Sequence, residues 1–268
     1  MARQLGHVKY KGTIGEIRHF KIKGMTGNFA GLNGGATGEQ IKSGASFVRT
    51  RENMNEFGGC ATVGKAIRSG QSQLMKQMSD AQFTGRLTGV VKKINLEDQS
   101  EARGYRAILI SAQSQYLVGM NFNKNNSFEG SFTGALEVVA NVDRNSVTLN
   151  VDPFNALTEV NAPAGATHFR LVNSISTISD YAFNYVTKVY EAIEPLQSEL
   201  SKVTYSEYIE LAPGNSPLVS VVSALNGSPV LTADVSLISC IGIEFYQKAG
   251  AAYYAFSVGN SMKIKAIF

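Results

Sequence analysis

The first 51 residues constrain the fold most, because they are too basic and too rich in glycine to build a core of their own. Nine Lys and Arg stand here against two acids, and ten of the 26 glycines of the chain fall between Gly6 and Gly44. Segments of this kind bury too little apolar surface to offset the entropy of ordering the backbone. We therefore interpret residues 1–45 as a basic, glycine-rich arm that lies on another part of the chain, on a second subunit or on a polyanion.

Within the arm, the sequence predicts a β-hairpin over residues 7–23. Apolar and basic residues alternate on both sides of a turn expected at residues 12–15, and residues 24–44 follow as a loop or extended linker. A two-stranded hairpin is only marginally stable in water, so its apolar side chains are expected to contact a sheet edge of the same chain or of a neighbour. The subunit-contact candidates are Val8, Tyr10, Ile14, Ile17, Phe20 and Ile22.

Charge is distributed unevenly along the chain. Residues 1–95 hold fifteen Lys and Arg against five acids, a net of +10, whereas residues 96–268 hold ten against sixteen, a net of −6. The basic part is expected to meet either nucleic acid, with Tyr10 and Phe20 available for stacking on bases, or the acidic body of a second copy. The cations alternate with glycine and apolar residues, which favours the second copy. The basic residues of the arm are Arg3, Lys9, Lys11, Arg18, Lys21 and Lys23.

Residues 46–120 are predicted to be helical. Met54, Phe57 and Ala61 recur at i, i+3 and i+7 on one face of a first helix, which extends to residue 78 with a break expected near Gly58. The glycines of this helix indicate either that break or the close approach of another backbone. A second helix starting at Asp80 has a cleaner stripe, formed by Phe83, Leu87, Val90, Val91 and Ile94. Residues 105–120 are expected to form a third helix.

From residue 121 the pattern changes to short alternating runs separated by turn signals, which predicts antiparallel sheets. The expected strands are 136–142, 146–151, 167–173, 181–190, 203–211, 219–224, 230–237, 241–247, 252–256 and 262–268. They fit two small sandwich units, 121–195 and 196–268 with a joint near Pro195, or one large sandwich. The predicted fold class is α+β, mainly β: an N-terminal arm with a hairpin and helices, followed by one or two antiparallel β-sandwich domains of Ig-like type.

No catalytic, cofactor-binding or metal-binding pattern is found, so we do not expect an enzyme. The three histidines, His7, His19 and His168, have no carboxylate, Cys or second His at metal-ligand spacing. No serine stands in a G-x-S-x-G context, and the glycines of the arm match neither phosphate-binding nor dinucleotide-binding motifs. Cys60 and Cys240 are expected to be buried free thiols.

The sequence also bears on location. The first residues contain no apolar run typical of a secretory signal, and no segment is long and apolar enough to span a bilayer. We expect synthesis in the cytoplasm and no membrane span, with release in an extracellular particle as a further destination that would require lysis or a non-standard route.

Five segments along the whole chain resemble a family of uncharacterised proteins common in Bacteroidota genomes. They are the opening MARQ-x-G, KGTIG at 11–15, RTREN…EFG at 49–58, APAGATHFRLV at 162–172 and IGIEFYQ at 241–247. The resemblance implies a basic N-terminal arm, a helical middle and a C-terminal β-sandwich. It implies no activity and transfers no catalytic residue.

These observations lead us to expect a non-enzymatic structural protein that assembles with copies of itself into a particle, filament or tube, such as a phage-tail-like one, through exchange of the arm onto a neighbouring sandwich. Two alternatives stay open. The basic arm would serve a nucleic-acid-binding protein, and loops with Tyr246, Tyr253 and Tyr254 would serve a ligand- or glycan-binding sandwich, although the absence of Trp weighs against glycan platforms.

Overall fold

The computed structural model describes residues 1–32 and 34–268, which divide into two units, residues 1–51 and residues 52–268. The division lies six residues beyond the boundary predicted at residue 45 and falls inside the long helix α2 (Val48–Gly70).

The first unit contains a small antiparallel sheet, which we call the arm sheet. It consists of β1 (Ala2–Arg3), β2 (Gly12–Ile14), β3 (Ile17–Phe20) and β4 (Phe29–Leu32) in the order β1-β4-β3-β2. The helix α1 (Gly38–Ser43) follows, capped by Thr37, whose hydroxyl accepts a hydrogen bond from the Gln40 N–H. The short 3₁₀ turn η1 (Ala45–Phe47) then leads into α2.

A hairpin, β2–β3, lies within the predicted range 7–23, but the predicted first strand at residues 8–11 is wrong, because these residues precede β2 and belong to no strand. The turn also differs from the prediction. Ile14 pairs with Ile17, so the turn is Gly15-Glu16 rather than residues 12–15. A two-residue hairpin turn requires a left-handed backbone, and Gly15 adopts it with φ of 60°. Residues 24–44, predicted as a loop, contain β4 and α1; the prediction also covers Asn33, which lies outside the described residues.

The second unit is built on a large six-stranded antiparallel sheet. Its centre is the pair β7 (His168–Ser179) and β13 (Val235–Ala249), which run together over twelve residue pairs. On one side of this pair β7 is followed by β10 (Ser201–Tyr205) and β11 (Ile209–Glu210). On the other side β13 is followed by β14 (Ala252–Ala255) and β15 (Ser261–Ile267). Both faces of the central pair are buried.

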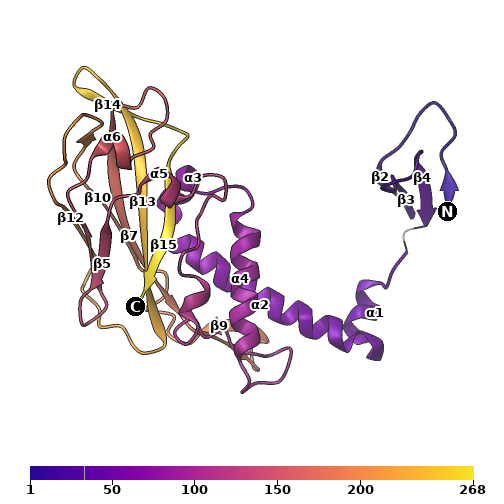
Figure 1. The fold of residues 1–268 in the computed structure, drawn as a ribbon. Helices are drawn as coiled ribbons and strands as arrows, with labels where there is room; N and C mark the ends of the chain where they lie inside the picture. Colours follow the sequence, from indigo (N-terminus) through magenta and orange to yellow (C-terminus); the bar gives the residue numbers. More distant parts are fainter. Residues whose placement is uncertain (33) are drawn as a thin grey trace. The chain divides into compact units, whose positions relative to one another are not determined.

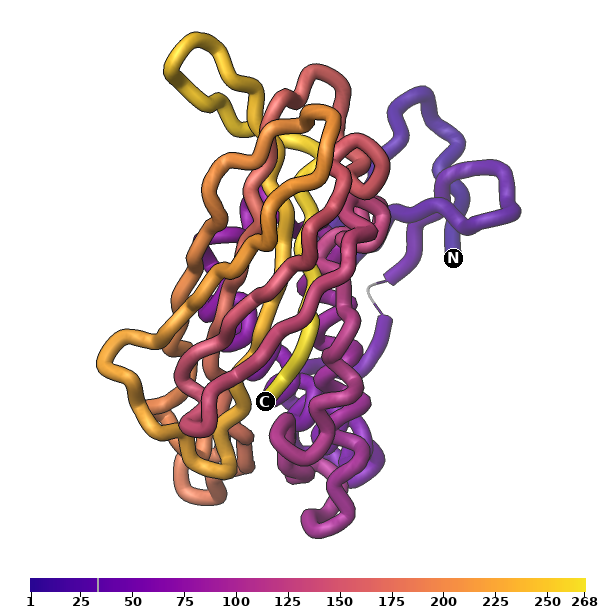
Figure 2. Tube along the Cα trace, turned by 60° about the vertical axis from the view of Figure 1, so that its left-hand side comes forward, coloured from indigo at the N-terminus to yellow at the C-terminus, as the bar shows by residue number. Residues whose placement is uncertain are grey.

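A smaller sheet packs on one face of the large sheet. It has the order β12-β6-β5, with β5 (Leu136–Ala140), β6 (Ser146–Val151) and β12 (Val219–Ala224). Leu149, Val151 and Val221 from this sheet pack against Phe169 and Ile243 from the large one. Figure 2 shows the small sheet, in magenta and orange, in front of the yellow strands of the large sheet.

The strands before and after residue 195 share both sheets. β6 pairs with β12, and β7 pairs with β13. The separation into units 121–195 and 196–268 is therefore wrong, and the alternative of a single two-sheet body is what the structure shows. The broader prediction of an α+β, mainly β fold with antiparallel sheets is confirmed.

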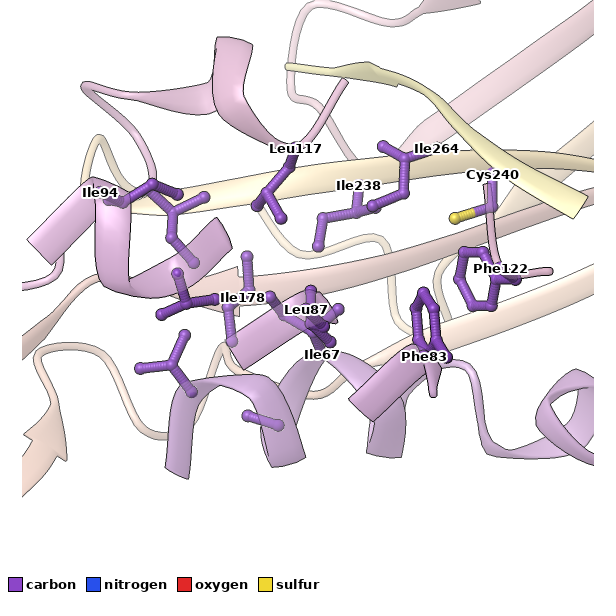
Figure 3. Close-up of a cluster of buried hydrophobic side chains, with 14 of the residues drawn as sticks. Ile67, Phe83, Leu87, Ile94, Leu117, Phe122, Ile178, Ile238, Cys240 and Ile264 are labelled. Carbon is purple, nitrogen blue, oxygen red and sulfur yellow. The ribbon is translucent and has the colours of Figure 1, made fainter. Parts of the chain in front are cut away.

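Three helices cover the other face of the large sheet: α2, α3 (Ser72–Met78) and α4 (Phe83–Glu97) (Figure 1). Ile67 of α2 and Leu87 of α4 pack with Ile178 and Ile238 of the sheet in one buried cluster (Figure 3). The stripe predicted for α4 is confirmed, since Phe83, Leu87, Val91 and Ile94 are buried and Val90 is packed against them.

Two helical predictions are wrong. Met54 and Phe57 of α2 are exposed, because the buried face is formed by Gly59, Cys60 and Val63 instead. Residues 105–120 form irregular chain with one 3₁₀ turn, η2 (Ser114–Tyr116), because their apolar side chains reach the core without a helical period. The remaining elements are the hairpin β8 (Tyr181–Asn184) and β9 (Val189–Ala192) and the single turns α5 (Phe128–Ser131) and α6 (Ala156–Glu159).

Both cysteines are buried free thiols, as expected. Burial raises the pKa of the Cys60 thiol to about 12 and raises the pKa of the Cys240 thiol as well. Within the described ranges, the search for a helix of the length and apolar character needed to cross a bilayer finds none.

Candidate assembly surface

The arm sheet has one apolar face that is open to solvent. Ile14 pairs with Ile17, and Ile17 pairs with Leu32, so these three side chains line up across β2, β3 and β4 on the same face. Their exposed fractions are 57%, 46% and 80%. We call these three residues the arm apolar face. A groove of about 330 Å³ adjoins it, lined by Met1, Ala2, Ile17, Ala30, Gly31 and Leu32.

The arm sheet has almost no interior. Among residues 1–32 and 34–51, Phe29 alone is buried. A sheet of a few short strands needs a packed hydrophobic face for independent stability. The arm sheet therefore presents the type of surface that gains stability when a partner covers it.

The opposite face of the arm sheet is basic and aromatic. Phe20 pairs with Phe29, and their rings lie 6.3 Å apart between centroids. The Arg18 guanidinium lies over the Phe20 ring at 5.4 Å, and Arg3 pairs with Phe29 from β1. The two faces thus differ in chemistry: one carries Ile14, Ile17 and Leu32 together with His19, and the other combines Arg side chains with the Phe rings.

The structure brings two of the six predicted contact residues, Ile14 and Ile17, together on the arm apolar face. The other four lie elsewhere: Phe20 on the opposite face, Tyr10 with its ring 5.5 Å from that of His19, and Val8 and Ile22 outside the strands. Leu32, the most exposed member of the face, is not among the predicted contact residues, because the sequence pattern predicts a loop or extended linker over residues 24–44. Four apolar or small residues between glycine-rich turns were the signal for β4.

The cations of the arm are available for partners. Lys9 Nζ donates to the Gln4 carbonyl oxygen at 2.9 Å and to the Gly6 carbonyl. In the described ranges, no carboxylate pairs with any of the predicted basic residues Arg3, Lys9, Lys11, Arg18, Lys21 and Lys23.

The second unit has a groove whose charged residues are acidic, in contrast to the basic arm. We call it the β11–β12 groove. It has a volume of about 430 Å³ and is lined by residues 206–210 and 217–220, next to the edge strands β11 and β12. Ile209, Leu218 and Val219 form its apolar part. Glu207 and Glu210 are exposed, and neither carboxylate has an ion-pair partner in the part of the chain that the structure describes.

Tyrosines gather beside this groove. The Tyr208 ring stacks on Tyr253 with centroids 3.7 Å apart, and the Arg170 guanidinium lies 4.6 Å from the Tyr205 ring centroid and 4.8 Å from that of Tyr208. Arg170 and Tyr253 thus already occupy the stacking surfaces of these rings. Of the tyrosines in the ligand-binding hypothesis, Tyr246 and Tyr253 join this cluster, each in ring contact with Tyr208, whereas Tyr254 is exposed.

A buried carboxyl lies under these rings. Glu244 pairs with Arg170 across the central strands and accepts a hydrogen bond from the Tyr246 hydroxyl at 2.6 Å. Burial raises the pKa of the Glu244 carboxyl, and burial together with Glu244 raises the pKa of the Tyr246 phenol. The cluster is accordingly a packed element of the sheet rather than an open cage.

In residues 1–32 and 34–268, no group of three or more His, Cys, Asp and Glu side chains is arranged to hold a metal ion. The His168 Nδ1 lies 3.0 Å from the Thr167 hydroxyl oxygen, and its ring contacts the Tyr253 ring edge-on. The absence of enzymatic activity and of a cofactor stays a prediction.

Comparisons with known protein families, curated proteins and solved structures find no match to this chain. The resemblance to a Bacteroidota family therefore also stays a prediction.

Proposed function

We propose that this chain is a non-enzymatic structural protein whose N-terminal arm joins copies of it into a homo-oligomeric particle, filament or tube. The observation that carries the proposal is the arm sheet itself: four strands with an exposed aliphatic face and one buried side chain, Phe29. A surface of this kind is expected to be covered in the working state of a protein.

The charges support a second copy as the cover. Residues 1–32 carry six Lys and Arg against one acid, a net of +5, whereas residues 52–268 carry sixteen against nineteen, a net of −3. Electrostatic complementarity of this sign steers association and disfavours pairing of like surfaces. When the arm of one copy binds the body of another, the net positive charge of the arm is balanced by the net negative charge of the body, and no further partner is needed.

The two-sheet body suits this role. Each sheet ends in edge strands, and extended segments bind proteins by adding to such edges. We further propose that the two-sheet body is an Ig-like sandwich and that the assembly is tubular, like a phage tail. The assembled particle is proposed to be released from the cell.

The proposal is tested by light scattering and negative-stain microscopy on the full-length protein and on an Ile17→Asp variant. A charge on the arm apolar face opposes its burial, so we expect the wild type to assemble and the variant to lose most of the assembled species. Leu196→Asp is the matched control, since Leu196 is 91% exposed in the other unit. A wild-type protein that stays a monodisperse monomer at about 100 μM, a concentration well above the Kd of stable complexes, would refute the proposal.

Nucleic acid is the second candidate partner, supported by the six arm cations and by Arg18 lying over Phe20. The burial of the arm rings weakens it: Phe29 is buried and Phe20 is half-buried, which leaves Tyr10, at 52% exposure, as the candidate ring for stacking on bases. Retention of the full-length protein on a DNA or RNA column that falls steeply with salt would favour this candidate, because phosphate contacts release counterions. Salt-insensitive retention would count against it.

A further inference from the structure

The β11–β12 groove lies between two strands with unpaired backbone edges. The Leu211 N–H donates to the Thr167 carbonyl oxygen at 2.9 Å, so the alternation of the ladder directs the N–H and C=O of Glu210 away from β7. The Leu225 N–H donates to the Asn145 carbonyl oxygen at 2.8 Å, which by the same rule directs the backbone groups of Ser220 away from β6. Both strands are the last on their side of their sheets.

The walls of this groove define what fits into it. Ile209, Leu218 and Val219 are apolar, and the two charged residues of the lining, Glu207 and Glu210, are both acidic. Unpaired edge groups bind an extended backbone, and pockets along the edge select alternate side chains. The groove therefore suits an extended segment in which apolar residues alternate with cations.

The arm contains one such segment that no strand uses. Val8-Lys9-Tyr10-Lys11 alternates apolar and basic residues, lies outside β1 and β2, and exposes both Val8 and Tyr10. The Tyr10 N–H is held by the side chain of Gln4, with Oε1 at 2.9 Å, rather than by a sheet. The similar run Phe20-Lys21-Ile22-Lys23 is less suitable, because Phe20 already pairs with Phe29 in the arm sheet.

We infer that the β11–β12 groove receives residues 8–11 of a second copy, with Val8 and Tyr10 against the apolar wall and Lys9 and Lys11 near Glu207 and Glu210. This inference rests on the proposed function and names the surface that the arm meets. The contact is heterologous, since an arm on one copy meets a groove on the next. Each added copy leaves one arm and one groove free, which produces a filament or a closed ring rather than a two-fold dimer.

Charge reversal tests the inference on full-length chains. Lys9→Glu with Lys11→Glu reverses the arm, and Glu207→Lys with Glu210→Lys reverses the groove. In each variant alone, the charges of the arm and of the groove have the same sign. Two ion pairs are lost and repulsion replaces them, so we expect the protein concentration at which half of the chains are assembled, measured by light scattering, to rise about tenfold. An equal mixture restores attraction between opposite copies and is expected to assemble like the wild type. Failure of the mixture to recover would overturn the inference.

A cross-link provides the second measurement. Tyr10→Cys and Leu218→Cys in one chain are expected to form disulfide-linked oligomers under mild oxidation, whereas Tyr10→Cys with Leu196→Cys is expected to give few. Cys60 and Cys240 do not interfere, because both are fully buried. Linked monomers without oligomers would show that an arm binds its own body and would overturn the second-copy assignment.

These experiments distinguish a failure of the proposed self-assembly from a failure of the groove assignment. If Ile17→Asp disperses the assembly while the groove reversal leaves it unchanged, the proposed function stands and the groove assignment is refuted. If the wild type does not assemble, both are refuted.

Discussion

Glu56 of α2 connects this helix to α4 through an ion pair and to the loop that follows α4 through a hydrogen bond. It is 1% exposed, its Oε1 accepts a hydrogen bond from the Gly104 N–H at 2.7 Å, and its Oε2 forms an ion pair with Lys92. Lys92 Nζ also donates to the Asn95 Oδ1 at 2.6 Å. Desolvation alone would raise the pKa of Glu56, but Lys92 and the Gly104 N–H outweigh it and hold this pKa below its usual value.

Replacing this carboxylate leaves Lys92 partly buried without its counter-charge. We expect Glu56→Gln to lower the free energy of unfolding by about 2 kcal/mol, less than the roughly 3–5 kcal/mol for a fully buried pair, because Lys92 still reaches water. Since the folded pKa is depressed, the stabilisation is present above the unfolded pKa near 4.5 and is lost as the pH falls through the lower folded value. Urea unfolding at pH 7 and at a series of pH values falling from 4.5 measures both effects, and the free energies of unfolding of the two proteins should converge only at the acid end of the series. Glu137→Gln, at an exposed position of β5, is the control.

At the scale of one helix, two neighbouring glycines in α2 have opposite surroundings. A Cβ on Gly59 would lie 2.5 Å from ring carbons of Tyr190, whereas a Cβ on Gly58 would meet nothing within 4 Å. We expect Gly59→Ala to lower the free energy of unfolding by about 2 kcal/mol through overpacking, and Gly58→Ala to raise it by about 0.5–1 kcal/mol through helix propensity. Denaturant midpoints of the two variants measure this difference. Equal effects would mean that the helix does not approach Tyr190 as closely as described.

A comparison of α4 with α2 shows why the buried face of one helix could be predicted from the sequence and that of the other could not. The buried stripe of α4 consists of large side chains, such as Phe83, Leu87 and Ile94, so its period was visible. The buried face of α2 contains Gly59, Cys60 and Gly64, which carry little hydrophobic signal. The larger Met54 and Phe57 therefore directed the prediction to the exposed face. The glycines of α2 were expected to mark either a break near Gly58 or the close approach of another backbone, and neither is present: the helix continues through Gly58, and the Tyr190 side-chain ring is what lies close to Gly59.

At the scale of the whole molecule, some strand runs were predictable but their partners were not. The predicted runs 230–237 and 241–247 are wrong as separate strands, since β13 is one strand, and the predicted run 181–190 is the hairpin β8–β9. β6 and β12 have the predicted bounds, because alternation is a local property. Their pairing joins residues about seventy positions apart, which no local pattern encodes. The groove between β11 and β12 depends on that pairing, so only its occupant, the alternating basic segment of the arm, could be proposed from the sequence.

The salt dependence of assembly distinguishes the attraction between arm and groove charges from the burial of the arm apolar face. The arm cations and the carboxylates Glu207 and Glu210 are exposed, so their attraction is screened when the Debye length shrinks from about 10 Å at 0.1 M salt to about 3 Å at 1 M. We expect higher NaCl to weaken wild-type assembly in light scattering of nuclease-treated protein. The Glu207→Lys, Glu210→Lys variant replaces attraction by repulsion, so the same salt should strengthen its residual assembly through the arm apolar face. A change of the same sign in both proteins would mean that the charges of the groove do not face the charges of the arm.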